Sequence, residues 1–290
     1  MIRENTAYKK RVKALIVEGG AMRGVFSTGV LDLFLEKNFN PFDIYYGVSA
    51  GACNLASYLA KMDRRNINIY TDYSLRPDFI SIRKFFGGGH FMDLDWLWNI
   101  TINETRLNLK TIFSSGRKFI VGLTDLLNGK PVYTETDESN LEEILKATSA
   151  LPFLYRGDLR FRDIPVADGG LSDPIPVEEA IKRGADNIMV IRSRPKSYEK
   201  KNSVFMKYLF HHFSRFPELE KLIESRIDKY NSSLEILRNP PENICITEVC
   251  PPQRFPVARL TRSRSHLYKG YEIGRQIGEP AIERWFSNGV

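Results

Sequence analysis

The pentapeptide Gly47-Val48-Ser49-Ala50-Gly51 joins two segments of opposite character and therefore constrains the fold around it. The apolar run 43–48 before it is rich in aromatic and β-branched residues, as in a buried strand, and the run 50–60 after it favours a helix. A sharp strand-to-helix turn of the G-x-S-x-G type holds the serine hydroxyl out beyond the sheet, and the flanking glycines tolerate the strained backbone. We therefore predict that Ser49 is a nucleophile.

A second strand, loop and helix precede it. The apolar run 11–18 leads into the glycine-rich loop 19–24, and apolar residues then recur at helical spacing over 26–34. Such a loop at the start of a helix offers free backbone N–H groups to an anion. The anion could be a nucleotide diphosphate, although Ala21 interrupts the dinucleotide fingerprint, or the oxyanion of an acyl-transfer intermediate. A nucleophile on the next strand favours the oxyanion.

A carboxylate ends a later apolar run. Asp168 follows the short run 164–167 and is followed by Gly169 and Gly170, so we expect it at the mouth of the sheet on a flexible turn.

The remaining elements predict an α/β fold. Segments 118–124 and 131–134 form a hairpin around Asn128-Gly129, and Ser139 with Glu142 suggests a capping box for a helix over 141–148. Strands and helices alternate up to residue 195, which indicates a mostly parallel central sheet sandwiched by helices. We expect residues 10–195 to be the catalytic core, and residues 196–290 to be a mainly helical region with one further strand, packed on the core.

Composition excludes several classes of protein. With 290 residues, 42% of them hydrophobic, the chain can bury a large core, and its three scattered cysteines provide no disulfide framework. The start of the sequence carries no secretory signal, and no apolar stretch is long enough to span a membrane, so we expect a cytoplasmic protein. The net charge of +7 fits an anionic partner or mere solubility, and no nucleic-acid-binding module accompanies it.

Two aromatic segments leave a peripheral contact with a membrane surface open. Segments 79–98 and 204–216 mix aromatic with charged residues, as a lid or a lipid-facing surface would. We favour helices that pack their aromatic side chains on the core, because aromatic stripes usually mark buried faces.

A serine hydroxyl at neutral pH needs a general base within hydrogen-bond reach to act as a nucleophile. None of the four histidines, His90, His211, His212 and His266, ends a predicted strand. Asp168 does, and desolvation together with a preorganised oxyanion hole would let a carboxylate serve.

At this point the chain resembles the patatin-like phospholipases over about residues 10–195. The loop 19–24, the pentapeptide 47–51 and Asp168-Gly169-Gly170 occur in the family's order, and the stretch 147–153 is similar to the family's segment before the aspartate. The resemblance implies a lipid acyl hydrolase that needs neither metal nor cofactor. Its nucleophile would be Ser49, its base Asp168 and its oxyanion hole the amides of Gly19, Gly20 and Ala21.

Further motif residues support this assignment: Arg23, Gly24, Gly47, Gly51, Gly169 and Gly170. The sequence departs from the family at Ala21, where a glycine is expected, but the backbone N–H survives the change. We expect Arg23 to fix the loop rather than to bind substrate. Two alternatives stay open, a histidine-dependent α/β-hydrolase and a nucleotide-binding module without catalysis.

Overall fold

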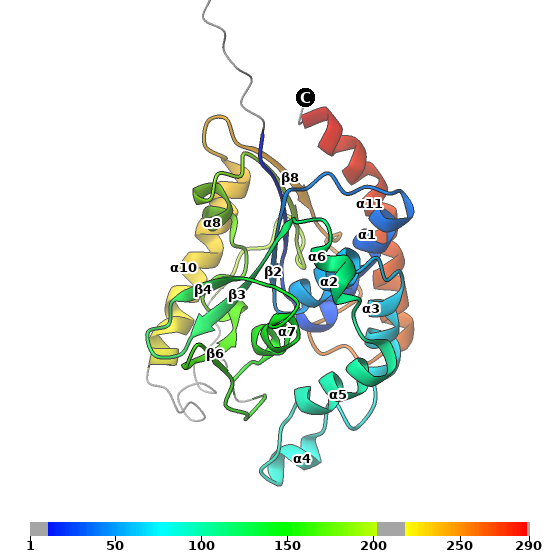
Figure 1. Ribbon diagram of the computed structural model, residues 1–290, viewed down its shortest axis with the longest axis vertical. Helices are drawn as coiled ribbons and strands as arrows, with labels where there is room; N and C mark the ends of the chain where they lie inside the picture. Colours follow the sequence, from blue (N-terminus) through cyan, green and yellow to red (C-terminus); the bar gives the residue numbers. More distant parts are fainter. Residues whose placement is uncertain (1–10, 153, 202–217, 289–290) are drawn as a thin grey trace, which may run out of the picture.

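The computed structural model describes residues 11–152, 154–201 and 218–288, and its centre is one mixed β-sheet (Figure 1). The strands lie in the order β5-β6-β3-β2-β1-β7-β8, and β4 pairs with β3. Strands β3, β2, β1, β7 and β8 are parallel, and β4, β5 and β6 add antiparallel pairs at one edge. The strands are β1 Lys13–Val17, β2 Ile44–Val48, β3 Lys118–Asp125, β4 Pro131–Glu135, β5 Arg160–Phe161, β6 Ile164–Asp168, β7 Asn187–Ile191 and β8 Cys245–Val249.

Alternating residues of β1 face two separate hydrophobic clusters. Leu15 and Val17 point to the side covered by α1, α2, α7 and α11, whereas Ala14 and Ile16 point to α8 and α10. Figure 1 shows α8 and α10 on one side of the sheet and α1 and α11 on the other. The main helices are α1 Val25–Glu36, α2 Ala50–Leu59, α7 Leu141–Ser149, α8 Val177–Lys182, α10 Glu218–Arg238 and α11 Arg264–Asn288. Since both faces of the sheet are buried, its parallel strands consist of almost continuous apolar runs.

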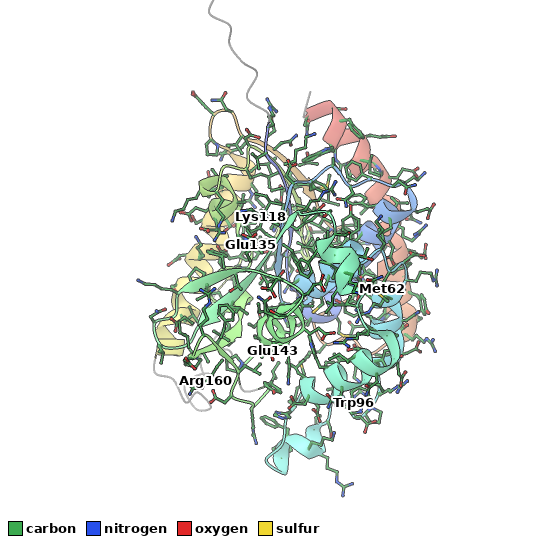
Figure 2. The ribbon with its side chains drawn as sticks, viewed as in Figure 1. Met62, Trp96, Lys118, Glu135, Glu143 and Arg160 are labelled. Carbon is green, nitrogen blue, oxygen red and sulfur yellow. The ribbon has the colours of Figure 1, made fainter. Side chains whose placement is uncertain are left out.

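The remaining helices, most of them of three to five residues, lie between β2 and β3 or directly after β1 and β6. They are η1 Ala21–Gly24, α3 Arg65–Asn68, η2 Ile69–Tyr73, α4 Ile82–Phe86, α5 Leu94–Thr105, α6 Leu109–Phe113 and η3 Gly169–Leu171. Helices α4 and α5 extend beyond the rest of the fold at the lower end of Figure 1. An exposed ion pair of 3.5 Å, between Lys118 and Glu135, joins the start of β3 to the end of β4 (Figure 2).

The predicted α/β class and the positions of its strands are confirmed. The capping box is wrong, because Asn140 occupies the N-cap of α7 and Ser139 instead donates to the carboxylate of Asp137. Asp137 also accepts from the backbone N–H of Asn140, so this carboxylate organises the turn before the helix.

Segment 204–216 lies outside the described residues. The division at residue 195 stays a prediction, although β8 and α10 supply one strand and one covering layer of the same sheet. None of the described helices combines the length and apolar character needed to cross a bilayer.

One buried carboxylate predicts how stability depends on pH. Asp32 of α1 is 5% exposed and accepts a 3.0 Å hydrogen bond from Tyr271 of α11; burial raises its pKa to about 7. The unfolded chain, in which this carboxyl has an ordinary pKa near 4, therefore binds fewer protons than the folded chain between pH 4 and 7. We expect this group to lower the free energy of unfolding by about 4 kcal/mol as pH rises through that window, with no further loss above it.

Asp32→Asn removes this ionisation, so its stability curve should lack that decline. Urea unfolding of both proteins from pH 4 to 8 measures it. Asp43→Asn, on the loop before β2, is the control variant. Parallel curves of unfolding free energy against pH for wild type and Asp32→Asn would contradict the assignment of the decline to Asp32.

Candidate active site

Ser49 lies at the turn between β2 and α2 in a strained conformation. Its φ of 53° and ψ of −134° are unusual for a residue with a side chain, as expected at a nucleophile elbow. Gly51 permits the turn, because a Cβ there would lie 2.3 Å from the carbonyl oxygen of Val17. The sequence therefore predicts the local shape correctly.

Asp168 reaches Ser49 from the far side of β3. Strand β3 lies between β2 and β6, with Val48 opposite Gly122 and Asp168 opposite Leu123, so the two strand ends stand at the same level. The Ser49 Oγ lies 2.7 Å from Asp168 Oδ2, within hydrogen-bond distance. The other carboxylate oxygen, Oδ1, accepts from the backbone N–H of Gly170 at 2.7 Å, which fixes the orientation of the carboxylate.

The environment of Asp168 suits a base. The residue is 4% exposed, and burial raises the pKa of its carboxyl, while the hydrogen bonds from Ser49 and Gly170 and the positive charges of Arg226 and Arg259 act in the opposite direction. A carboxylate with a raised pKa accepts a proton more readily than an exposed one does.

Thr148 supports the backbone of Ser49, a role that the sequence alone did not predict. Its hydroxyl donates to the Gly122 carbonyl at 2.6 Å and accepts from the backbone N–H of Ser49 at 2.9 Å. Thr148 thus connects α7 and β3 to the elbow. Its place within the stretch 147–153, which is similar to the family's segment before the aspartate, was the one available signal.

The glycine-rich loop lies directly against Ser49. A Cβ at Gly19 would lie 2.7 Å from the Cβ of Ser49, so only glycine permits this approach. Ala21 has a φ of 49°, a left-handed conformation in which glycine is unstrained. The backbone N–H groups of Gly19, Gly20 and Ala21 donate none of the hydrogen bonds between described residues. They are available to a developing oxyanion.

Arg23 holds this loop to the end of β7. Its Nε and Nη2 donate to the backbone oxygen and the hydroxyl of Ser193 at 3.2 and 3.3 Å, and the Ser193 hydroxyl donates to the Gly19 carbonyl at 2.9 Å. Glu18 accepts from the Ser193 N–H at 2.7 Å on the same side. These contacts give Arg23 the loop-fixing position expected from the sequence. Of the other motif glycines, Gly24 belongs to this loop, Gly47 to the elbow, and Gly169 and Gly170 to the turn after Asp168.

A cavity of about 500 Å³ opens beside these groups, a size typical of sites for small ligands. Ser49, Asp168 and the loop 19–23 line it. An apolar wall faces them, contributed mainly by the segment before α4 and by α5: Ile69, Phe79, Ile80, Met92, Leu94 and Leu97. The cavity can therefore hold an apolar chain next to the serine hydroxyl.

One part of segment 79–98 lines the cavity as part of this apolar wall, and another part is exposed to solvent. The bridge between Ile80 and Met92 closes the segment at its base, where Phe79 and Leu94 are buried. At its tip, Ile82 and Phe86 of α4 are 63% and 84% exposed. Packing thus accounts for the base of the segment only, and a lid formed by its tip stays a prediction.

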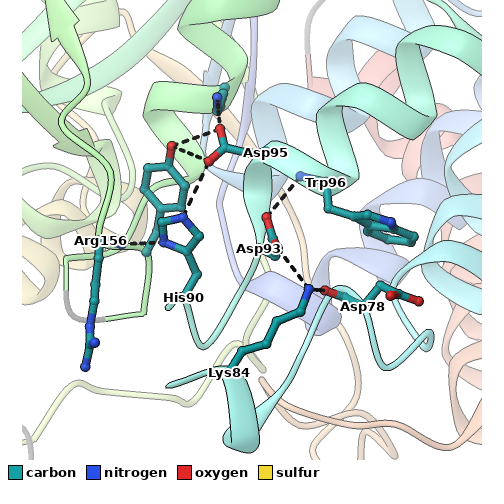
Figure 3. A network of polar contacts seen from close by, with 9 residues as sticks. Asp78, Lys84, His90, Asp93, Asp95, Trp96 and Arg156 are labelled. Atoms are coloured by element: carbon teal, nitrogen blue, oxygen red, sulfur yellow. Dashed lines mark hydrogen bonds and ion pairs between the residues drawn. The ribbon is translucent and has the colours of Figure 1, made fainter. Parts of the chain in front are cut away.

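A polar network ties the same segment to the loop 154–156 (Figure 3). His90 Nδ1 accepts from the Arg156 N–H at 2.9 Å, and His90 Nε2 lies 3.5 Å from a carboxylate oxygen of Asp95. Asp95 also pairs with Lys146, and Asp93 caps α5 while it pairs with Lys84 at 3.1 Å. His90, Asp93 and Asp95 are close enough to hold a metal ion, but their ligand atoms already have protein partners, so we assign the cluster a structural role.

The predicted histidine alternative has no support among the described residues. His90 belongs to the network above, and His266 is exposed near the start of α11. Neither lines the cavity or contacts Ser49. His211 and His212 lie outside the described residues.

Comparisons with known proteins identify the family of this chain. A family model described as patatin-like phospholipase matches residues 15–181, more than half of the chain. The chain belongs to the patatin-like phospholipase family. A second model, a domain of unknown function (DUF6363), matches residues 216–288.

Two curated relatives and one solved structure are similar. The uncharacterized protein YjjU of Escherichia coli (strain K12) is 32% identical over 277 residues, which cover 91% of this chain and 75% of that protein. The probable lipid hydrolase 463L of Invertebrate iridescent virus 6 is 25% identical, covering 60% of this chain and 64% of that one. The crystal structure of VipD from Legionella pneumophila has a TM-score of 0.47 at 13% identity, covering 94% of this chain and 67% of that one, and a likeness of this degree adds nothing to the assignment.

Proposed function

We propose that this member of the patatin-like phospholipase family is a serine lipid acyl hydrolase with a Ser49–Asp168 dyad. The observation that carries the proposal is the 2.7 Å contact between Ser49 Oγ and Asp168 Oδ2 at the wall of a cavity with an apolar side. The amides of Gly19, Gly20 and Ala21 beside them supply the oxyanion hole. The viral relative named as a probable lipid hydrolase supports the same class of reaction.

The reaction proceeds in two steps. Asp168 takes the proton of Ser49 as the serine oxygen attacks the ester carbonyl, and the loop amides stabilise the oxyanion. The ester bond breaks, the departing alcohol receives the proton from Asp168, and an acyl-serine remains. Water then gives a proton to Asp168 and attacks the acyl-serine, which releases the fatty acid and returns the proton to Ser49. No step requires a metal or a cofactor.

Contact with a membrane surface belongs to the same proposal. Exposed Ile82 and Phe86 on α4 stand at the far end of the segment whose base lines the cavity, and Arg83 lies between them in the sequence. Apolar side chains beside a positive charge suit the interface of an anionic membrane. An acyl chain could then pass from the bilayer to the apolar wall.

Active-site labelling tests the proposed nucleophile. A fluorophosphonate probe should form one adduct per chain, located on Ser49 by peptide mass analysis, and Ser49→Ala should abolish it. Ser74 lines the same cavity, so Ser74→Ala is the matched control and should still be labelled at Ser49. Esterase assays with phospholipid, lysophospholipid and triacylglycerol then define the substrate. An adduct on another residue, or tight binding of a dinucleotide without any adduct, would overturn the assignment.

A further inference from the structure

Basic side chains form a cluster on one part of the cavity wall. The cluster, called here the cationic wall, consists of Arg23, Arg194, Lys200, Arg226 and Arg259, all of which line the cavity that contains Ser49 and Asp168. Only Arg23 belongs to the part of the chain that matches the patatin-like phospholipase model. The other four follow β7 or belong to α10 and to the loop before α11.

The cationic wall is attached to both loops of the proposed dyad. Arg226 Nε donates to the carbonyl oxygen of Gly170 at 2.6 Å, in the turn that orients Asp168. The backbone oxygen of Arg259 accepts from the N–H of Met22 at 3.3 Å, in the glycine-rich loop. A ligand group held by these cations would therefore lie next to the scissile ester.

Among the residues that the structure describes, negative charge on the cationic wall is scarce. Of the described carboxylates, Glu18 acts on Arg23, Lys200 and Arg226, and Asp168 acts on Arg226. Both oxygens of Glu18 already accept hydrogen bonds, from the Ser193 N–H at 2.7 Å and from the Tyr230 hydroxyl at 3.1 Å. None of the ion pairs between described residues includes a member of the cationic wall.

Burial, and then the like charges of their neighbours, favour the neutral forms of Lys200 and Arg226. Burial and then the charges of Arg226, Arg259 and Arg194 lower the pKa of Lys200 to about 6, with Glu18 acting in the opposite direction. Burial and then Arg259 lower the pKa of Arg226 to about 10. An anion placed among these side chains would relieve the repulsion between them.

The two parts of the cavity wall thus differ in chemistry. The apolar wall comes from segments before residue 107, and the cationic wall comes mainly from residues 194–259. A ligand that satisfies both has an acyl chain at one end and an anionic group a short distance from its ester. Guanidinium groups bind phosphate oxygens in bidentate fashion, and several together suit a phosphate better than a single carboxylate.

We propose that the cationic wall binds the phosphate group of the lipid substrate, so that the chain from residue 194 onward supplies a headgroup subsite. This proposal rests on the proposed function, because it places the phosphate beside the ester that Ser49 attacks. It assigns the residues beyond the patatin-like match a part in substrate selection. Arg23 also fixes the glycine-rich loop, and Arg226 the turn of Asp168, whereas the side chains of Arg194 and Arg259 make no hydrogen bond to another described residue.

A binding measurement on the Ser49→Ala protein separates this subsite from catalysis. Calorimetry compares monohexanoylglycerol 3-phosphate with uncharged monohexanoylglycerol, and the phosphate ester should bind at least tenfold more tightly. Arg259→Gln and Arg194→Gln, each in the Ser49→Ala background, should remove most of this preference. Arg284→Gln removes the same charge from an exposed position of α11 and should retain it.

The proton balance of binding gives a second readout. The charges that act on Lys200 are those of Arg226 on α10, Arg259 in the loop before α11, Arg194 after β7 and Glu18 after β1, and its Nζ lies 5.3 Å from the ring centre of Tyr230 on α10. At pH 7 to 8 this lysine is largely neutral, and a bound phosphate should raise its pKa. Calorimetry in buffers of different ionisation enthalpy should therefore detect proton uptake with the phosphate ester, and none with the uncharged ester.

Three outcomes would overturn the proposal. The first is equal affinity for the phosphate ester and the uncharged ester. The second is that both arginine variants keep the preference for the phosphate ester and have the same melting temperature as the Ser49→Ala protein. The third is that inorganic phosphate binds as tightly as the phosphate ester, which would indicate a site for a free anion. Failure of wild type to hydrolyse any ester would refute the proposed function instead, and the binding comparison would still decide whether the cationic wall recognises phosphate.

Discussion

Asp168→Asn is expected to lower kcat/KM for ester hydrolysis by roughly 10³-fold, within the range of general base catalysis. An asparagine can keep its oxygen on the Gly170 N–H, where Asp168 Oδ1 accepts at 2.7 Å. Its amide nitrogen then faces Ser49 Oγ and donates a hydrogen bond instead of accepting a proton. The fold and the cavity remain, and the base is lost. Steady-state kinetics on a soluble short-chain ester measures the effect.

Asp173→Asn is the matched control for this variant. Asp173 is buried in the same stretch of chain and accepts a hydrogen bond from Tyr133, but it does not line the cavity. Its kcat/KM should stay within a few-fold of wild type. An Asp168→Asn protein that keeps more than a tenth of wild-type activity would rule out the dyad.

The acidic limb of the pH profile adds a further check. Burial raises the pKa of Asp168 above the ordinary carboxyl value of about 4. We therefore expect kcat/KM to fall, as pH decreases, at a pH higher than that ordinary value.

Gly274→Val is expected to lower the free energy of unfolding by about 3 kcal/mol or more. Helices α1 and α11 approach so closely that a Cβ at Gly274 would lie 2.2 Å from the carbonyl oxygen of Phe26, and one at Gly29 would lie 2.0 Å from that of Tyr271. Backbone atoms cannot rotate away, so a larger side chain must separate the two helices. Chemical denaturation measures the loss.

Gln276→Val controls for the weak helix propensity of valine. Gln276 is exposed on the same helix, two residues further on, and its replacement should cost less than about 1 kcal/mol. If Gly274→Val were as stable as Gln276→Val, α11 would not pack on α1 as described. The same result would count against residues 196–290 being packed on the core.

The sequence determined the local structure of the site. Apolar runs before position 19, before Ser49 and at Asp168 predict three strands, and the residues that follow each of them predict sharp turns. Periodicity and glycine placement act over a few residues, so they define where a strand ends and how its last residue is held. The predicted capping box at Ser139 was wrong because the carboxylate of Asp137 organises the same turn. The local sequence alone does not show which of these two side chains accepts the hydrogen bonds of the turn.

Only the tertiary structure decided which of these strand ends meet. The order β6-β3-β2 places Asp168 and Ser49 on either side of β3, 119 positions apart in sequence. The Thr148 hydroxyl of α7 then lies between the Gly122 carbonyl of β3 and the N–H of Ser49. The tertiary structure also brings Arg194, Arg226 and Arg259 together on one wall of the cavity. Single basic residues scattered over a chain of net charge +7 carry no local pattern, so their proximity emerges only when β7, α10 and the loop before α11 pack against the sheet.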